Sequence, residues 1–160
     1  MHEPTNTNFT LIKEFHAAFN HPLSETPNPA LLSDEKLMKL RVDLISEELS
    51  EFQDAIKNRD FVEAADAIGD LLYVVYGAAA CFGFDADKVF REIHRSNMTK
   101  LCTSEQEAIE TVNFYHETTT RKVGYSKSSL PGYWVVFDEQ SGKILKSKCY
   151  TPPDLAPLLE

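Results

Sequence analysis

The sequence predicts an all-α fold, a four-helix bundle that carries a short C-terminal helix and a β-hairpin as an appendage. Three observations support this prediction. Apolar residues recur at helical spacing in four segments, capping residues stand between these segments, and a β-type pattern appears only after Leu101. We therefore expect a helical core over residues 1–102 and an appendage over residues 103–160 that packs on the same domain.

The four helices are expected over residues 8–19, 34–58, 60–81 and 85–97. Ser33 or Asp34 can cap the second helix, and Asp60 with Glu63 forms a capping-box pattern at the start of the third. Gly83 can end the third helix. The Pro-rich segment between the first two helices is expected to be an ordered connector, because the amphipathic helices on both sides need a shared partner.

The C-terminal appendage mixes helix and strand patterns. Residues 104–115 look helical, residues 116–131 are polar and irregular, and residues 133–137 are typical of a β-strand. Turn-forming residues 138–142 can connect that strand to residues 143–148. We therefore expect these two segments to pair as a β-hairpin.

The composition limits the classes of function. The 25 Asp and Glu residues outnumber the 16 Lys and Arg residues, so the net charge is −9, and the excess of acids lies in the first half of the chain. This balance argues against binding to nucleic acid phosphates and favours a divalent metal ion or a basic partner. Cys81, Cys102 and Cys149 form no CxxC pair, and the N-terminus has no signal-peptide pattern, so we expect a cytoplasmic protein.

An uncharged run over residues 71–84 indicates how the protein assembles. The run is shorter than the roughly 20 residues that a membrane-spanning helix requires, so we expect a buried core helix and no membrane association. A helix that is apolar all round must be covered, and one small bundle can hardly cover it on every side. We therefore expect a homodimer or a larger even-numbered assembly.

Two of the expected helices carry acids on their apolar faces. On the second helix, Glu48 and Glu51 point in nearly the same direction as the apolar stripe, and Glu47 precedes them. On the third helix, Asp66 and Asp70 are about one turn apart and share a face. Desolvating neighbouring carboxylates is costly unless a cation or a proton compensates. The two helices are thus expected to form an oxygen-rich pocket for Mg²⁺, with Mn²⁺ as a possibility.

A solvated helix face is the ordinary alternative for an E-E-x-x-E pattern. The apolar phasing of the pattern and the second acidic helix favour metal ligands instead. Glu63 shares the face of Asp66, but its pairing with Asp60 explains it as a capping residue, so it ranks below Asp66 and Asp70 as a ligand.

Three passages, taken in order, resemble the all-α NTP pyrophosphohydrolases, the MazG-like and phosphoribosyl-ATP pyrophosphohydrolase-like superfamily. They are Glu47-Glu48-Leu-Ser-Glu51, Asp66-Ala-Ile-Gly-Asp70-Leu-Leu-Tyr-Val-Val-Tyr-Gly77 and His94-Arg-Ser-Asn97-Met-Thr-Lys100. The resemblance covers about residues 8–102, with a weaker echo in residues 142–146 and 150–153.

This resemblance implies a Mg²⁺-dependent hydrolase that cleaves a nucleoside triphosphate, expected to be a deoxynucleotide, between the α and β phosphates to release pyrophosphate. It also implies a homodimer or larger assembly. Glu48, Glu51 and Asp70 would be metal ligands. Glu47 and Glu48 would serve catalysis, with Glu47 either a further ligand or the residue that orients the attacking water.

The resemblance also suggests substrate contacts. Asn97 and Lys100 match positions expected to hold the phosphates or the nucleotide, and Tyr73 and His94 are further substrate-binding candidates. A helix C-terminal cap with a cation near the helix dipole is the alternative for Asn97 and Lys100. A core or interface histidine is the alternative for His94.

One departure from the family pattern leaves the fourth metal ligand open. Many relatives have Glu at the position of Ala67, and here either Asp66 or Glu63 can replace it. Two other functions also stay open. The same metal chemistry could hydrolyse phosphoribosyl-ATP, or the chain could be a non-catalytic helical module that binds a nucleotide, a metal or, through the C-terminal hairpin, a partner.

Overall fold

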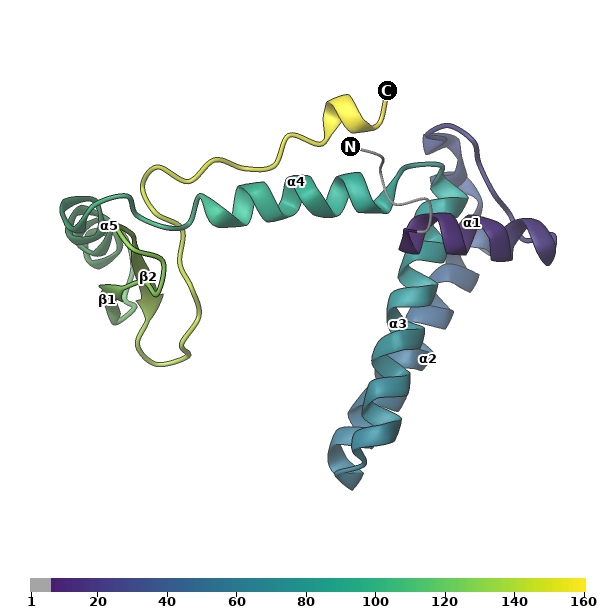
Figure 1. Cartoon of the computed structure of the whole chain (residues 1–160), viewed down its shortest axis with the longest axis horizontal. Helices are drawn as coiled ribbons and strands as arrows, with labels where there is room; N and C mark the ends of the chain where they lie inside the picture. Colours follow the sequence, from purple (N-terminus) through teal and green to yellow (C-terminus); the bar gives the residue numbers. More distant parts are fainter. Residues whose placement is uncertain (1–6) are drawn as a thin grey trace. The chain divides into compact units, whose positions relative to one another are not determined.

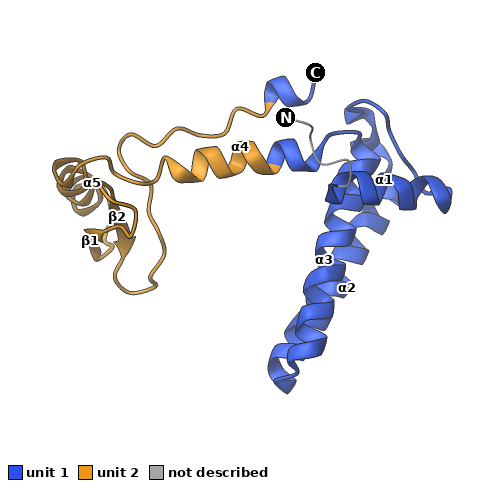
Figure 2. Ribbon diagram, in the orientation of Figure 1, with its two compact units in different colours: residues 1–89, 156–160 blue, residues 90–155 orange. Residues whose placement is uncertain are grey.

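The computed structural model describes residues 7–160, which form five α-helices, two short 3-10 helices and two β-strands (Figure 1). The elements are α1 Asn8–Ala18, η1 Pro29–Ser33, α2 Glu35–Asn58, α3 Phe61–Phe82, α4 Ala86–Met98, α5 Glu105–Thr118, β1 Val123–Lys127, β2 Trp134–Asp138 and η2 Ala156–Leu158. They divide into two compact units (Figure 2). Unit 1 contains the chain up to residue 89 together with residues 156–160, and unit 2 contains residues 90–155. The predicted predominance of helix is confirmed.

Capping side chains set the boundaries of the long helices. Asp34, not Ser33, caps α2, and the Asp60 carboxylate accepts hydrogen bonds from two amides in the first turn of α3. The predicted capping box at α3 is only half formed, because the Asp60 amide donates to the Ala55 carbonyl at 3.0 Å. A role in capping therefore does not account for the Glu63 carboxylate, and that part of the prediction is wrong.

Gly83 ends α3 as predicted. Its φ is +80°, and a Cβ at this position would lie 2.1 Å from the Thr26 carbonyl oxygen, so only glycine fits without displacing the backbone. The Pro-rich connector is fastened at the same place, because the Ser24 and Asn28 amides donate to carbonyls in the last turn of α3. The connector is thus ordered, as expected.

The core of unit 1 is an antiparallel pair of long helices. α2 and α3 are joined by Arg59 and Asp60 and pack along each other, and α1 packs on α3 (Figure 1). Buried Ala55 and Ala67 let the two long helices approach closely. Within the described residues, unit 1 holds α1, α2, α3 and only the first turn of α4. The predicted four-helix bundle is therefore not seen in this single chain.

By length and composition alone, α3 is the one helix among residues 7–160 that could cross a membrane. It carries Asp66 and Asp70 in its first half and packs against α2. The same composition is found in core helices of proteins whose remaining surface is covered by further protein.

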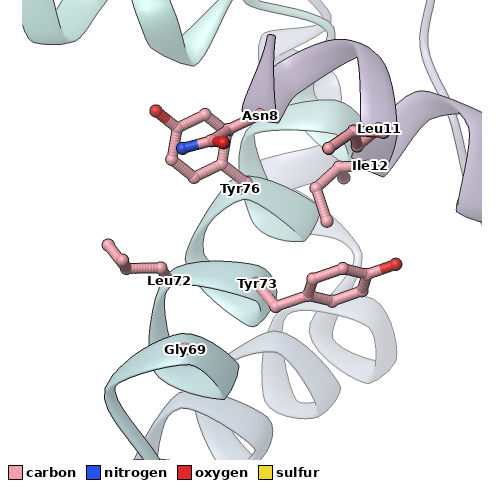
Figure 3. Close-up of a pocket in the computed structure, with 7 residues that line it drawn as sticks. All are labelled: Asn8, Leu11, Ile12, Gly69, Leu72, Tyr73 and Tyr76. Atoms are coloured by element: carbon pink, nitrogen blue, oxygen red, sulfur yellow. The ribbon is translucent and has the colours of Figure 1, made fainter. Parts of the chain in front are cut away.

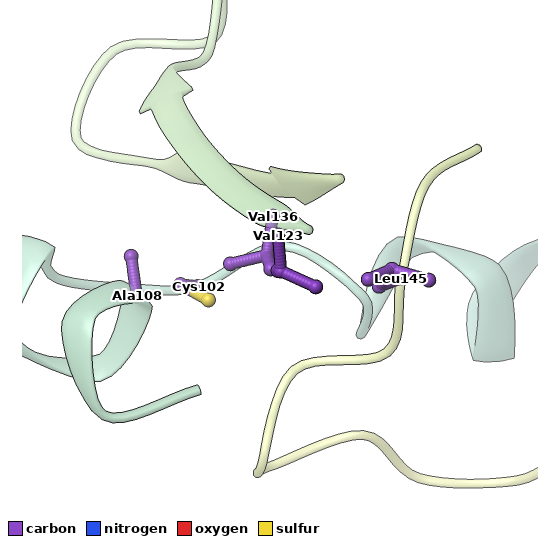
Figure 4. Packing of buried hydrophobic residues seen from close by; sticks show 5 residues of the cluster. All are labelled: Cys102, Ala108, Val123, Val136 and Leu145. Atoms are coloured by element: carbon purple, nitrogen blue, oxygen red, sulfur yellow. The ribbon is translucent and has the colours of Figure 1, made fainter. Parts of the chain in front are cut away.

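Unit 2 has a small hydrophobic core of its own. α5 packs on the antiparallel β1–β2 pair. The buried cluster consists of Cys102, Ala108, Val123, Val136 and Leu145 (Figure 4). Ser104 caps α5, and the Glu107 carboxylate accepts hydrogen bonds from the amide and hydroxyl of Thr103, both at 2.9 Å. These local bonds fix the start of the helix, one residue after the predicted boundary.

The strand pairing differs from the predicted hairpin. β2 pairs with β1, which lies in the stretch expected to be irregular, whereas residues 143–148 contribute only a single bridge, between Ile144 and Phe137. The latter segment leaves the sheet because its end is held elsewhere, with the Ser147 hydroxyl donating to the Thr99 carbonyl at 3.0 Å. The predicted strand near β2 is therefore confirmed. Its predicted pairing with residues 143–148 is confirmed only at the start of that segment, where the Asp138 amide donates to the Lys143 carbonyl and the Leu145 amide donates to the Val136 carbonyl, both at 2.9 Å.

Candidate active site

The acids expected to bind metal lie along the α2–α3 pair. Glu47, Glu51, Asp66 and Asp70 are exposed, so the prediction that these acids lie on inward apolar faces is wrong for all of them except Glu48. Glu48 is half-buried, and burial is the largest cause that raises the pKa of its carboxyl above the ordinary value. The negative charges that raise this pKa further are, in order of effect, those of Glu51, Asp70, Glu47 and Asp66. These neighbours come from both helices, so the fold gathers the five acids into one electrostatic neighbourhood.

Helical register explains why Glu47, Glu51, Asp66 and Asp70 share one side of the pair. On α2, Glu47 and Glu51 each lie two residues from Leu49, which is exposed. Two residues correspond to a rotation of about 200° around the helix axis, so both acids lie on the side away from Leu49. On α3, Asp66 and Asp70 each lie two residues from the exposed Ile68, so they too lie on the side away from an exposed apolar residue. The acidic side of the helix pair is therefore opposite to an exposed apolar side.

The chemistry of this donor set fits a hard divalent cation, since all five side chains offer carboxylate oxygens. As the side chains stand, no three His, Cys, Asp or Glu groups among residues 7–160 come close enough to hold a metal ion. Burial raises the pKa of Glu48 most and repulsion from the neighbouring carboxylates raises it further, and a divalent cation would relieve that repulsion. Gathering the ligands around one ion requires rotation of these side chains.

A pocket of about 170 Å³ opens between α1 and α3 (Figure 3). Its lining consists of Asn8, Leu11, Ile12, Gly69, Leu72, Tyr73 and Tyr76. Tyr73, a predicted substrate contact, is thus part of the wall. Gly69 leaves space beside it, because a Cβ there would meet nothing within 4 Å, and Tyr76 is held by its hydroxyl donating to Asp87 at 2.8 Å. The pocket therefore has two tyrosines in its wall, and its lining residue Gly69 is adjacent in sequence to Asp70.

A buried charged side chain that sequence reasoning missed lies near this pocket. Arg41 on α2 is 5% exposed, and its Nε and Nη2 atoms have no hydrogen-bond partner. A Cβ on Gly77 would lie 3.5 Å from its Nη1 and 3.1 Å from Nε2 of His16. The sequence contained one sign of a role for Arg41. It precedes Glu48 by seven residues and therefore lies on the same face of α2 as this predicted ligand.

His16 beside it lies in surroundings that favour the neutral form of its imidazole. It is 3% exposed, and its Nδ1 lies 2.7 Å from the Pro22 carbonyl, to which it donates. Burial lowers the pKa of His16, the bond to Pro22 opposes this change, and the charges of Arg41 and His21 lower the pKa further. With Nδ1 protonated, Nε2 carries a lone pair on the side of Gly77.

The other predicted substrate contacts belong to unit 2. His94 and Asn97 are exposed on α4, and Lys100 is half-buried just after it. The Lys100 amide donates to the Asn97 carbonyl at 3.1 Å, so these two residues form a turn at the end of the helix. Their backbone role is thus the one expected of a helix terminus, and both side chains remain available for other contacts.

Within unit 2, the C-terminal tail, residues 142–155, contacts the same end of α4. The Ser96 hydroxyl is buried and lies 2.9 Å from both the Tyr150 hydroxyl and the Thr151 carbonyl. The Lys146 ammonium lies 4.4 Å above the centre of the Tyr150 ring. The tail contains residues 142–146 and 150–153, which resemble the family more weakly, and these contacts fix the position of Lys146, Tyr150 and Thr151.

Comparison with known proteins bears on the same residues. The family model described as phosphoribosyl-ATP pyrophosphohydrolase matches residues 12–97. An uncharacterized protein, L479, of Acanthamoeba polyphaga mimivirus is 27% identical, with 96% of each chain covered. The family match spans all five acids, both long helices and most of the pocket lining, and it ends at Asn97.

Proposed function

Because the chain belongs to the phosphoribosyl-ATP pyrophosphohydrolase family, a branch of the MazG-like nucleotide pyrophosphohydrolases, we propose that it is a Mg²⁺-dependent nucleoside triphosphate pyrophosphohydrolase. It would cleave the bond between the α and β phosphates, giving a nucleoside or deoxynucleoside monophosphate and pyrophosphate. The observation that carries this proposal is that two neighbouring helices bring four further carboxylates around Glu48, whose pKa is raised by burial and, to a smaller extent, by the charges of those four. Oxygen donors of this kind suit Mg²⁺, with Mn²⁺ as a substitute.

Each acid has a part in the proposed reaction. The ligands are Glu48, Glu51, Asp66 and Asp70. Bound Mg²⁺ would neutralise charge on the phosphate oxygens as the bond breaks. Glu47 accepts a hydrogen bond from the attacking water, orients it and can take its proton. Water is the nucleophile and pyrophosphate the leaving group, so no side-chain nucleophile is needed.

The pocket between α1 and α3 is the proposed place of the nucleoside. Its lining is apolar and aromatic, which suits a base and a sugar. Because Gly69 lines the pocket and adjoins Asp70, a nucleoside there would have its phosphates beside the acids. Asn97, Lys100 and His94 are proposed as further contacts to the substrate.

A homodimer is part of the proposal, and its interface would be the apolar face of the α2–α3 pair. This face consists of Val42, Leu49, Ile56, Phe61, Ile68 and Val75, which are 43% to 86% exposed. On each helix the three residues recur every seven positions, the period of coiled-coil packing. The face lies opposite to Glu47, Glu51, Asp66 and Asp70, so a second copy could cover it and leave these carboxylates accessible.

Phosphoribosyl-ATP is a second candidate substrate, favoured by the description of the matching family model. Its scissile bond is the same phosphoanhydride, so the same acids would act on it. The difference between the two candidates lies in the group that enters the pocket.

The test is pyrophosphate release, with Mg²⁺, from a panel of ribonucleoside and deoxyribonucleoside triphosphates and phosphoribosyl-ATP. We expect Glu48→Gln, Glu51→Gln and Asp70→Asn each to abolish turnover while the protein stays folded by circular dichroism. Glu117→Gln, which removes an exposed acid in unit 2, is the matched control. Near-wild-type turnover by all three variants would refute the site, and nucleotide binding without turnover would indicate a binding module.

A further inference from the structure

One edge of the Arg41 guanidinium has no hydrogen-bond partner inside unit 1. Its Nε and Nη2 atoms are buried and unpartnered, and no Asp or Glu oxygen among residues 7–160 lies within 4.0 Å of it. Arginine stays charged, and a buried charge without a partner is costly. Nε and Nη2 lie on the same side of the planar group, so they can donate parallel bonds to two adjacent acceptors.

The residues beside Arg41 lie on the two helices that line the pocket. Tyr73 lines the pocket and precedes Gly77 by four residues on α3, and Ile12 lines it and precedes His16 by four residues on α1. Each helix therefore leads from a pocket residue to a neighbour of Arg41 in one turn, about 6 Å. The buried guanidinium is not itself part of the pocket lining, and the two residues beside it, His16 and Gly77, each lie about one helical turn from a lining residue.

The acids lie toward the opposite end. Along α3 the order is Asp70, then Tyr73, then Gly77, so a proposed metal ligand and the neighbour of Arg41 are separated by about 10 Å. On α2, Glu48 and Arg41 show the same separation of seven residues on one face. A nucleotide that places its phosphates at the acids and its nucleoside in the pocket would direct the edge of its base toward Arg41.

We propose that Arg41 selects the nucleobase of the substrate, with Nε and Nη2 donating to two adjacent acceptors on the base edge. This inference rests on the proposed function and adds the substrate class to it. Guanine offers such a pair at O6 and N7, and cytosine offers one at O2 and N3. Uracil has an N–H donor at N3, and adenine has an amino group beside N7, so each lacks the pair on the corresponding edge.

His16 and Gly77 position the Arg41 guanidinium. His16 is anchored through Nδ1 to Pro22 and turns Nε2 toward Gly77. The contact that a Cβ would make with this nitrogen is 3.1 Å, tighter than ordinary packing, so glycine lets the histidine and the arginine share the space. A neutral His16 leaves Arg41 as the charged donor of this group.

The first experiment compares kcat/KM for CTP against UTP and for GTP against ATP. A bidentate arginine contact discriminates by roughly ten- to a hundredfold, so the wild-type protein should show a ratio of that size for at least one pair. Arg41→Met should bring that ratio close to one. Arg121→Met, which removes an exposed arginine in unit 2, should keep the wild-type ratio. The pair that responds identifies the base.

A second experiment uses the wild-type protein and so does not depend on the folding of a variant. Calorimetry would compare CMP with its 3-deaza analogue and GMP with its 7-deaza analogue, each of which lacks one acceptor. The preferred parent should bind about tenfold or more tightly than its analogue. Equal binding of parents and analogues, or a wild-type ratio that persists in Arg41→Met, would overturn the proposal. Absence of turnover with every nucleotide would refute the proposed function, while the calorimetric comparison would still decide the role of Arg41.

Discussion

Asp66 and Glu63 compete for the place of the fourth metal ligand, and their surroundings differ. Asp66 is among the charges that raise the pKa of Glu48, and Glu63 is not. We expect Asp66→Asn to lower Mg²⁺-dependent turnover by more than about tenfold, because it removes a carboxylate next to the proposed ligands. Glu63→Gln should keep most of the activity. Turnover of both variants across a Mg²⁺ titration is the measurement.

Glu63→Gln is a matched control because it makes the same change in charge one turn away. Its free energy of unfolding should fall by less than about 1 kcal/mol, since the carboxylate lies in the first turn of α3, where the helix dipole favours it. An active Asp66→Asn variant together with an inactive Glu63→Gln variant would assign the ligand to Glu63 and refute our choice.

Residues whose role is local could be predicted from the sequence, and residues whose role is tertiary could not. Asp60 and Gly83 act on the backbone of their own helix ends, so spacing alone was enough. Arg41 is buried by α1 and α3, and the residues that surround it are 25 and 36 positions away in the sequence, at His16 and Gly77. Its spacing from Glu48 indicated a shared helix face, but the sequence of α2 gave no sign that α1 and α3 would enclose the guanidinium.

The same distinction holds for the secondary-structure elements. The helices were predicted because each carries its own period of apolar residues and its own cap. β1 was missed because Val123-Gly-Tyr-Ser-Lys127 has a glycine and no clear alternation. Its place beside β2 depends on α5, against which both strands pack, so pairing could not be read from the turn residues alone.

Burial of Glu48 and its repulsion by neighbouring acids on α2 and α3 predict a dependence of stability on pH. The pKa of Glu48 is raised above 4.5 in the folded chain, so the folded state holds this proton more tightly than the unfolded state does. The corresponding stability is present below the unfolded pKa and is lost as the pH rises through the folded pKa. For metal-free protein we expect Tm to fall more steeply above about pH 4.5 in the wild type than in Glu48→Gln.

Thermal unfolding from about pH 4 to 7, with a chelator and then with Mg²⁺, checks this expectation. Mg²⁺ should raise the Tm of the wild type near neutral pH and have much less effect on Glu48→Gln, because the variant lacks a ligand. Glu117→Gln should follow the wild type in both conditions. Parallel pH profiles for the wild type and Glu48→Gln would show that the acids do not repel one another as described.

At the scale of the whole molecule, the predicted four-helix bundle points beyond one chain. Unit 1 supplies one antiparallel pair of long helices with an apolar face that the described residues leave exposed. Two copies of that pair, joined through their apolar faces, would bring together four long helices. A sequence pattern reports that a helix face must be covered, but it carries no information on which chain covers it.

We therefore expect light scattering at micromolar concentration to give twice the chain mass of 18.1 kDa, or a larger even multiple. The double variant Leu49→Glu, Ile68→Glu places a charge in the middle of both apolar stripes, and burying those charges at an interface is costly, so it should be monomeric. Leu130→Glu is the matched control, because Leu130 is 45% exposed, close to the 43% of Leu49 and 47% of Ile68, and lies in unit 2. A monomeric wild-type protein would refute the dimer, and a double variant that keeps the wild-type mass would show that the copies meet through another surface.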